Sequence, residues 1–245
     1  MLPNAVDLEF AVFFAVGGAL LDYFVFMPRV RKAIESGRPG ARAGGYRVMI
    51  VGEWALVAFV AGRWLWLQRP RSMLWLIVPQ GWRLIVAGAI VVATAWLLVA
   101  QIRSVATLDA EKRAALRPSL GSVAFLLPHT AVEKHWFLGL SVTAGVCEEV
   151  LYRGFLVWAM QPWLGLWGAA LVSVLAFGVA HAYQGSGGLV RTTLVGAVLG
   201  GIALLTGSIL PGIVVHAMVD VLGGTTGYLI LRDPEQAQAT AGQGR

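Results

Sequence analysis

The sequence predicts an all-α fold, a polytopic membrane helix bundle with about seven transmembrane helices, and two observations support this prediction. Apolar residues make up 58% of the 245 residues and charged residues only 13%, against roughly 25% charged residues in soluble domains. The apolar residues also recur in stretches close to the roughly 20 residues that a helix needs to cross a bilayer. One soluble core cannot bury this much apolar surface, so we expect a multi-pass integral membrane protein.

Seven stretches are apolar enough to cross the membrane, and basic residues gather between some of them. The stretches lie near residues 8–27, 48–67, 84–102, 138–160, 164–182, 189–206 and 209–231. The segments from Arg29 to Arg47 and from Arg103 to Lys134 are rich in Arg and Lys, as cytoplasmic loops tend to be. This places the N-terminus outside and the C-terminus inside. Arg69, Arg71 and Arg83 would then face outside, against the same rule.

Charge and cysteine content narrow the class of protein further. The net charge of +6 comes from residues between the apolar stretches, so we expect membrane lipid, and no nucleic acid, as a partner. Cys147 is the only cysteine, which excludes an internal disulfide. The first apolar stretch follows acidic rather than basic residues and lacks a cleavage site, so no signal peptide is expected. Arg outnumbers Lys sixteen to three, which favours a bacterial source and the bacterial plasma membrane.

Ionisable residues are concentrated in the last four stretches. The first three are almost clean of ionisable groups, apart from residues such as Asp22 and Glu53 that we place near the helix ends. An ionisable group at the centre of a membrane helix costs roughly 2.5–3.5 kcal/mol on insertion scales, so such groups indicate function and a nearby partner. The last four stretches contain Glu148, Glu149, Arg153, His181, His216 and Asp220.

Helical spacing assigns the first partners. Residues four apart share a helix face, so Glu149 should pair with Arg153, and His216 should share a face with Asp220. Glu148 is turned by about 100° from Glu149 and has no cation on its own helix. Glu148 is therefore the carboxylate that remains available for chemistry.

These groups are suited to hydrolysis. A desolvated carboxylate is a usable general base, and a nearby His can help to orient the same water, so Glu148 with His181 could activate water. His216 and Asp220 would face the carbonyl oxygen, where a donor stabilises the oxyanion. Since ionised Asp cannot donate, Asp220 is either protonated or orients His216 through a hydrogen bond. These four residues are the candidate catalytic set.

Other readings of the same residues stay open. The Glu and His side chains could bind a metal in a metal-dependent peptidase, although no cofactor is the favoured expectation. They could form a polar packing network in a noncatalytic interaction or bacteriocin-immunity protein, or line the ion pathway of a transporter. The chain lacks the HExxH zinc motif and the GxSxG elbow, and Cys147 has no His beside it in sequence.

Three motifs resemble those of the CAAX protease and bacteriocin-processing family, also called CPBP or Abi proteins, which are intramembrane glutamic endopeptidases. They are Glu148 to Arg153 (EEVLYR), Phe177 to His181 (FGVAH) and His216 to Asp220 (HAMVD), in the family's order. The resemblance implies that Glu148 and His181 activate water and that His216 and position 220 form the oxyanion site. It also implies supporting roles for Glu149, Arg153 and Phe177, and a peptide or membrane-protein substrate.

The resemblance spans residues 138–231 and leaves the substrate open. Eukaryotic prenyl-protein proteases of the family carry Asn where this chain has Asp220, and other members are linked to bacteriocin self-immunity. We divide the chain into N-terminal membrane helices and basic loops (1–135), a catalytic helix bundle (136–232) and a disordered tail (233–245). In the predicted spans His181 lies nearer the inner face than Glu148. Either the fifth helix extends past Tyr183, or the fourth begins later, near Gly145.

Overall fold

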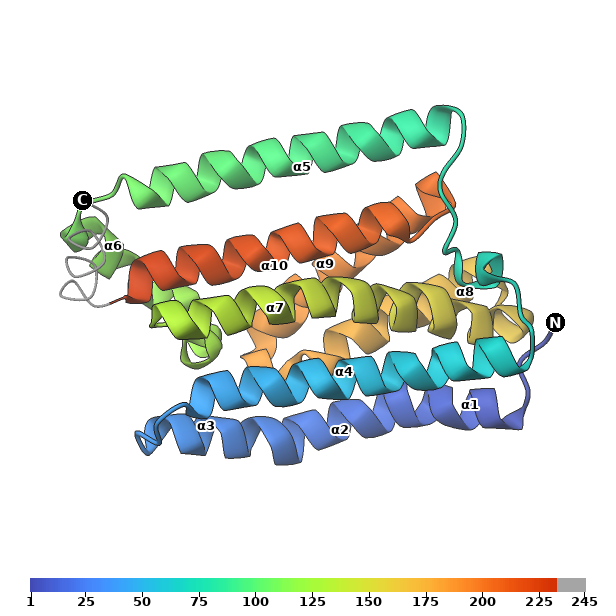
Figure 1. The fold of residues 1–245 in the computed structure, drawn as a ribbon, viewed down its shortest axis with the longest axis horizontal. Helices are drawn as coiled ribbons and strands as arrows, with labels where there is room; N and C mark the ends of the chain where they lie inside the picture. Colours follow the sequence, from blue (N-terminus) through green and yellow to red (C-terminus); the bar gives the residue numbers. More distant parts are fainter. Residues whose placement is uncertain (233–245) are drawn as a thin grey trace.

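A computed structural model describes residues 1–232, and in these residues the predicted all-α bundle is confirmed (Figure 1). No strand occurs among them. The predicted tail, residues 233–245, lies outside the described part of the chain. The elements are α1 (Ala5–Val12), η1 (Phe13–Gly18), α2 (Ala19–Leu21), η2 (Asp22–Phe26), α3 (Met27–Glu35), α4 (Ala41–Trp66), η3 (Arg71–Leu74), α5 (Trp82–Ala106), α6 (Ala110–Leu116), η4 (Arg117–Leu126), α7 (Ala131–Glu148), η5 (Glu149–Leu156), α8 (Val157–Ala180), η6 (Ala182–Gln184), α9 (Gly185–Thr206) and α10 (Leu210–Leu231).

Six helical stretches of the described chain are long and apolar enough to cross a membrane, and one of them crosses twice. The stretch Ala131–Ala180 contains Gly165, whose φ of 64° and ψ of 176° are not helical. The chain reverses direction there. A hydrogen bond across the hairpin shows the reversal: Ser173 Oγ donates to the carbonyl oxygen of Tyr152, 21 residues earlier, at 2.9 Å. The bundle therefore has the expected number of about seven crossings.

The reversal at Gly165 also brings two candidate residues to the same height. Glu148 lies 17 residues before Gly165 and His181 lies 16 residues after it, so they face each other across the hairpin. The two helix boundaries that we proposed to bring these residues level are both wrong. Helix α7 begins at Ala131, earlier than the expected 138, and α8 ends at Ala180. The predicted spans placed Glu148 and His181 at different depths because their boundaries were wrong. The first helix, α7, is longer than predicted, and the second half of α8 is shorter.

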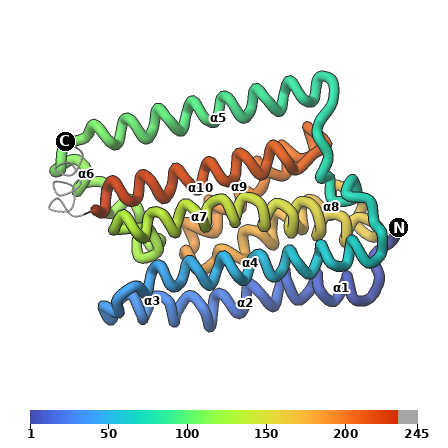
Figure 2. Tube along the Cα trace, in the orientation of Figure 1, coloured from blue at the N-terminus to red at the C-terminus, as the bar shows by residue number. Residues whose placement is uncertain are grey.

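The N-terminal helix is longer than the sequence indicated. The elements α1 to α3 form one helical stretch from Ala5 to Glu35, which runs antiparallel to α4 and beside it (Figure 2). It packs on the C-terminal half of the chain, since the ring of Phe14 lies 4.6 Å from that of Tyr152. Helices from both parts of the predicted division at residue 135 thus share one core.

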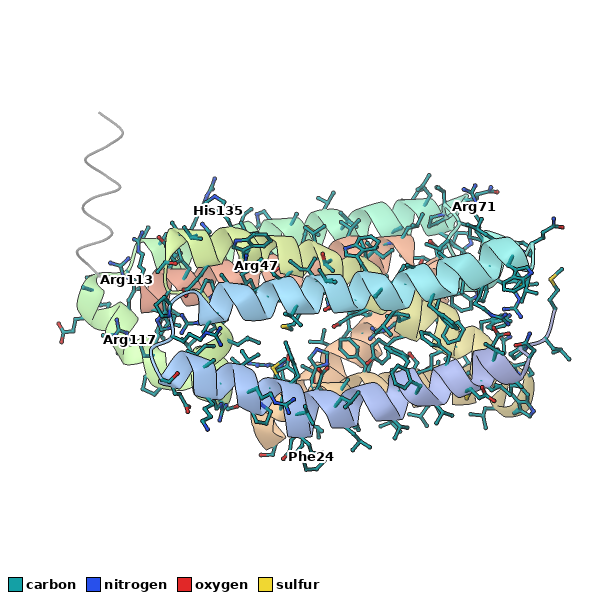
Figure 3. All side chains as sticks on the ribbon, turned by 60° about the horizontal axis from the view of Figure 1, so that its bottom comes forward. Phe24, Arg47, Arg71, Arg113, Arg117 and His135 are labelled. Carbon is teal, nitrogen blue, oxygen red and sulfur yellow. The ribbon has the colours of Figure 1, made fainter. Side chains whose placement is uncertain are left out.

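Polar contacts fasten the bundle at both ends. At one end the buried Asp7 carboxylate pairs with Arg63 at 3.2 Å and with Arg69 at 2.6 Å. At the other end Arg42 donates to the Phe125 carbonyl and pairs with Glu133, each at 2.8 Å. The two predicted basic loops therefore meet at one end of the bundle. Figure 3 shows Arg113 and Arg117 at that end and Arg71 at the opposite one.

The outer surface suits a lipid environment. Helix α5 lies over α10 (Figure 1) and buries only Ala87 of its 25 residues. Its remaining surface carries large apolar side chains such as Trp96 and Ile85, which are exposed. Apolar side chains on this scale are stable in contact with lipid and not with water. The protein is an integral, multi-pass membrane protein.

Helices α7 and α10 approach each other closely at Gly145. A Cβ atom on Gly145 would lie 2.7 Å from both the Cβ and the backbone nitrogen of Ala217, the residue after His216. We expect Gly145→Ala to destabilise the protein by about 1–3 kcal/mol, the usual cost of overpacking, and to separate Glu148 from His216. Thermal denaturation in detergent measures this effect.

Gly139→Ala is the matched control on the same helix. A Cβ at Gly139 would meet only Ile50 Cδ1, at an ordinary 3.8 Å. Equal melting temperatures for the two variants would contradict the close contact between α7 and α10.

Candidate active site

The three predicted motifs lie on separate helices and converge at the middle of the bundle. Glu148 is the last residue of α7, His181 caps the C-terminus of α8, and His216 lies two turns into α10. The segment η5, which begins at Glu149, is a π-helix. Such wide turns are often found at functional sites, and this one carries Glu149 and Arg153.

A buried ion network forms the base of the site. Arg153 Nη1 donates to Glu149 Oε1 at 2.8 Å, which confirms the predicted pair, and Arg153 Nη2 donates to the Gly196 carbonyl of α9 at 3.0 Å. The same Glu149 oxygen lies 3.0 Å from His216 Nδ1. Because an ionised carboxylate only accepts, Nδ1 carries the proton. Glu149 therefore joins α10 to η5 and fixes which edge of His216 faces the site.

Glu148 and His181 face each other across a short gap. His181 Nδ1 lies 2.8 Å from the Phe177 carbonyl oxygen, which can only accept, so Nδ1 carries a proton. The other ring nitrogen, Nε2, lies 4.0 Å from Glu148 Oε1. This distance exceeds a direct hydrogen bond. It suits one water that donates a hydrogen to each atom.

His216 presents its second nitrogen between two carboxylates. Nε2 lies 3.6 Å from Glu148 Oε2 and 3.7 Å from Asp220 Oδ2. Both distances are too long for hydrogen bonds, so Nε2 stays available to another group. Of the two predicted roles for Asp220, orientation of His216 through a hydrogen bond is wrong for this structure, because Glu149 is the residue that orients His216.

Phe177 is the apolar centre of the cluster. Its ring lies 4.3 Å from the Arg153 guanidinium carbon and 4.7 Å from the His181 ring, measured to ring centroids. It also meets the His216 ring edge-on at 5.7 Å. Phe177 thus shields the Arg153 charge and holds both imidazole rings by contact.

The residues of the cluster fall into two groups by the exposed fraction of their side chains. The side chains of Glu149, Arg153 and His216 are 0%, 2% and 4% exposed, whereas Glu148 and His181 are each 16% exposed and Asp220 36%. The first group can only support the site or present one atom to it. The second group can meet water and a substrate. Cys147 is fully buried, so it is not placed to act as a nucleophile.

A cavity of about 360 Å³ opens in front of Glu148 and His181. Its other walls come from the N-terminal helix and α4, and they include Asp22 and Glu53. The prediction that these two residues lie near helix ends is wrong. Asp22 is central in Ala5–Glu35 and Glu53 is central in Ala41–Trp66, because both helices extend beyond the predicted spans. A carboxylate at mid-membrane was the signal that could have linked them to the site.

The candidate site contains His and carboxylate side chains, which are the types that can bind a metal ion. Among residues 1–232, no group of three or more His, Cys, Asp or Glu side chains has the geometry to hold a metal ion. The Glu148 oxygens lie 4.0 Å and 3.6 Å from the two His nitrogens.

One comparison with known proteins gives a match. Residues 130–222 match the family model described as type II CAAX prenyl endopeptidase Rce1-like. No curated protein and no solved structure matches the chain. The matched region begins at the N-cap of α7 and ends in α10, so it contains all seven candidate residues. Residues 130–222 are thus similar to the CAAX prenyl endopeptidases, the family that the three motifs resemble.

Proposed function

We propose that the protein is an intramembrane endopeptidase that hydrolyses peptide bonds of membrane-embedded or membrane-associated substrates with a water activated by Glu148 and His181. The observation that carries this proposal is the 4.0 Å gap between Glu148 Oε1 and His181 Nε2, two acceptors that face each other beside a cavity. The match of residues 130–222 to the model of a protease family supports it.

The reaction follows from the positions of the acceptors. Glu148 takes a proton from the water as its oxygen attacks the carbonyl carbon, and His181 Nε2 accepts the water's second hydrogen in a hydrogen bond that aims the lone pair. The carbonyl oxygen becomes an oxyanion in the tetrahedral intermediate. Glu148 then gives its proton to the leaving nitrogen, the C–N bond breaks, and an acid and an amine are released. A positioned base contributes about 10²–10⁴-fold to such a step.

His216 and Asp220 are suited to stabilising the oxyanion. His216 Nε2 lies between Glu148 and Asp220 without a hydrogen bond to either one. Glu149 accepts from Nδ1, and its charge favours an imidazolium that can donate through Nε2. Asp220 would add a second donor in its protonated form.

The role of Asp220 predicts different results for two substitutions. We expect Asp220→Asn to keep kcat/KM within about tenfold, since its amide can donate, and Asp220→Leu to lose about 10²–10³-fold, as for other oxyanion donors. Kinetics on one peptide measure both. Equal loss in the two variants would show that the carboxylate charge is needed and that neutral donation is not the role of Asp220.

The proposed location is the bacterial plasma membrane. Members of this protease family differ in their substrates, which include prenylated proteins and bacteriocin-related peptides. The proposal therefore commits to the peptide bond and the membrane setting.

Cleavage of a membrane-peptide library tests the proposed function. Purified wild type, Glu148→Ala and His181→Ala are compared in lipid, each with and without a strong chelator. We expect cleavage by wild type only, unchanged by the chelator. Loss of wild-type cleavage on chelation would favour the metal-dependent peptidase, and cleavage by none of the proteins would favour the noncatalytic interaction protein.

A further inference from the structure

The N-terminal helices contribute two carboxylates to the cavity in front of Glu148 and His181. Asp22 comes from η2 and Glu53 from α4, and both line the cavity. Neither residue takes part in the proposed hydrolysis. The matched family region, residues 130–222, does not include them either.

These carboxylates have no compensating cation in the described chain. Glu53 Oε2 is buried and has no hydrogen-bond partner. The acidic and basic residues that line the cavity with Glu53 are Asp22, Glu148 and His181, and no Lys or Arg of the described chain lines it. His181 lines the same cavity, but the proposed reaction uses its Nε2 as an acceptor, so it does not supply a positive charge. Burial of a carboxylate without a counter-charge costs free energy in a membrane. The cavity therefore favours a positively charged ligand.

Contacts between neighbouring helices place the two carboxylates at one height. Trp54 Nε1 donates to Thr143 Oγ1 at 3.3 Å, so Glu53 on the parallel helix α4 is level with about residue 142. Phe14 packs against Tyr152, so Asp22, eight residues further along the antiparallel N-terminal helix, is level with about residue 144. At 1.5 Å per residue, both lie roughly 6–9 Å from Glu148 in height along the bundle axis, toward the end that carries the basic loops.

We propose that Asp22 and Glu53 are specificity-determining residues that bind a Lys or Arg side chain of the peptide substrate, two or three residues from the bond that is cleaved. This proposal rests on the proposed peptidase function. An extended peptide advances about 3.3 Å per residue, so 6–9 Å corresponds to two or three residues. The cavity volume, about 360 Å³, lies in the range of roughly 300–1,000 Å³ usual for ligand pockets.

Matched peptides test the selection of a cation. The peptides carry Lys, norleucine or Glu at one position near the scissile bond and are presented in phosphatidylcholine vesicles, which offer no primary amine. We expect wild type to prefer Lys over norleucine by about tenfold or more in kcat/KM, and to cleave the Glu peptide least. Glu53→Gln should abolish the preference for Lys over norleucine, and Asp22→Asn should reduce it.

Glu9→Gln is the matched control, because Glu9 is exposed on α1 and does not line the cavity. It should leave the preference unchanged. A wild type that does not distinguish Lys from norleucine would overturn the proposal, as would a preference that survives in both Glu53→Gln and Asp22→Asn.

Peptide binding to the Glu148→Gln protein separates this inference from the proposed function. If wild type cleaves no peptide, the peptidase function fails, but binding can still be measured. Tighter binding of the Lys peptide than of the norleucine peptide, lost in Glu53→Gln/Glu148→Gln, would support the cation site. Equal binding of the two peptides would overturn it.

Discussion

Glu148→Gln is expected to lower kcat/KM for peptide cleavage by about 10²–10⁴-fold, the contribution of a general base. Gln has nearly the shape of Glu, so the cavity wall and the contacts of α7 are preserved. Its amide cannot take the proton from the water that Glu148 Oε1 and His181 Nε2 would hold between them. The loss should therefore appear in kcat while peptide binding stays close to that of wild type.

The control for this experiment is Glu9→Gln, which removes an exposed carboxylate from α1. It should cleave at the wild-type rate, and all three proteins should melt at similar temperatures. Wild-type activity in Glu148→Gln would contradict the role of this carboxylate. A low melting temperature for this variant would instead show that Glu148 supports the fold.

Glu149→Gln is expected to destabilise the protein by about 3–5 kcal/mol, because removing one partner of a buried pair leaves the other charge unpaired. Arg153 is 2% exposed and Glu149 is 0% exposed, so water cannot replace the lost partner. The amide oxygen of Gln can still accept from His216 Nδ1, but the hydrogen bond is no longer strengthened by a negative charge. Thermal denaturation in detergent micelles measures the stability, and peptide cleavage in lipid measures the activity.

A double substitution separates stability from activity. Glu149→Met with Arg153→Met removes both charges, and such replacements are often neutral or stabilising. We expect it to recover stability but not cleavage, because His216 still lacks Glu149. The exposed Glu111 on α6 gives a control, and Glu111→Gln should change neither quantity. A fully active double variant would contradict the orienting role of Glu149.

The part of the site that is local in sequence could be predicted. The long apolar stretches predicted the membrane helices, and four-residue spacing predicted the pair of Glu149 with Arg153, found at 2.8 Å. The spacing also predicted that Glu148 does not take part in this ion pair. Both inferences use only the geometry of one helix, and the π-helical segment η5 keeps residues four apart on nearly the same face.

The part that depends on packing between helices could not be predicted. The same spacing rule suggested Asp220 as the partner of His216, but Glu149 Oε1, 67 positions away in sequence, is the one within hydrogen-bond distance. The reversal at Gly165 set the height of His181 and was hidden in one long apolar run. Asp22 and Glu53 were placed near helix ends because hydropathy underestimates the length of helices with polar ends.

The central claim is that Glu148 and His181 act on one water, and a double-mutant cycle tests it most directly. Rates of cleavage of one peptide are measured in lipid for wild type, Glu148→Gln, His181→Ala and the double variant. Because residues that act as a unit are strongly non-additive, we predict that the double variant is no slower than the slower single variant. Losses that multiply in the double variant would show that the two residues act independently and would contradict the account.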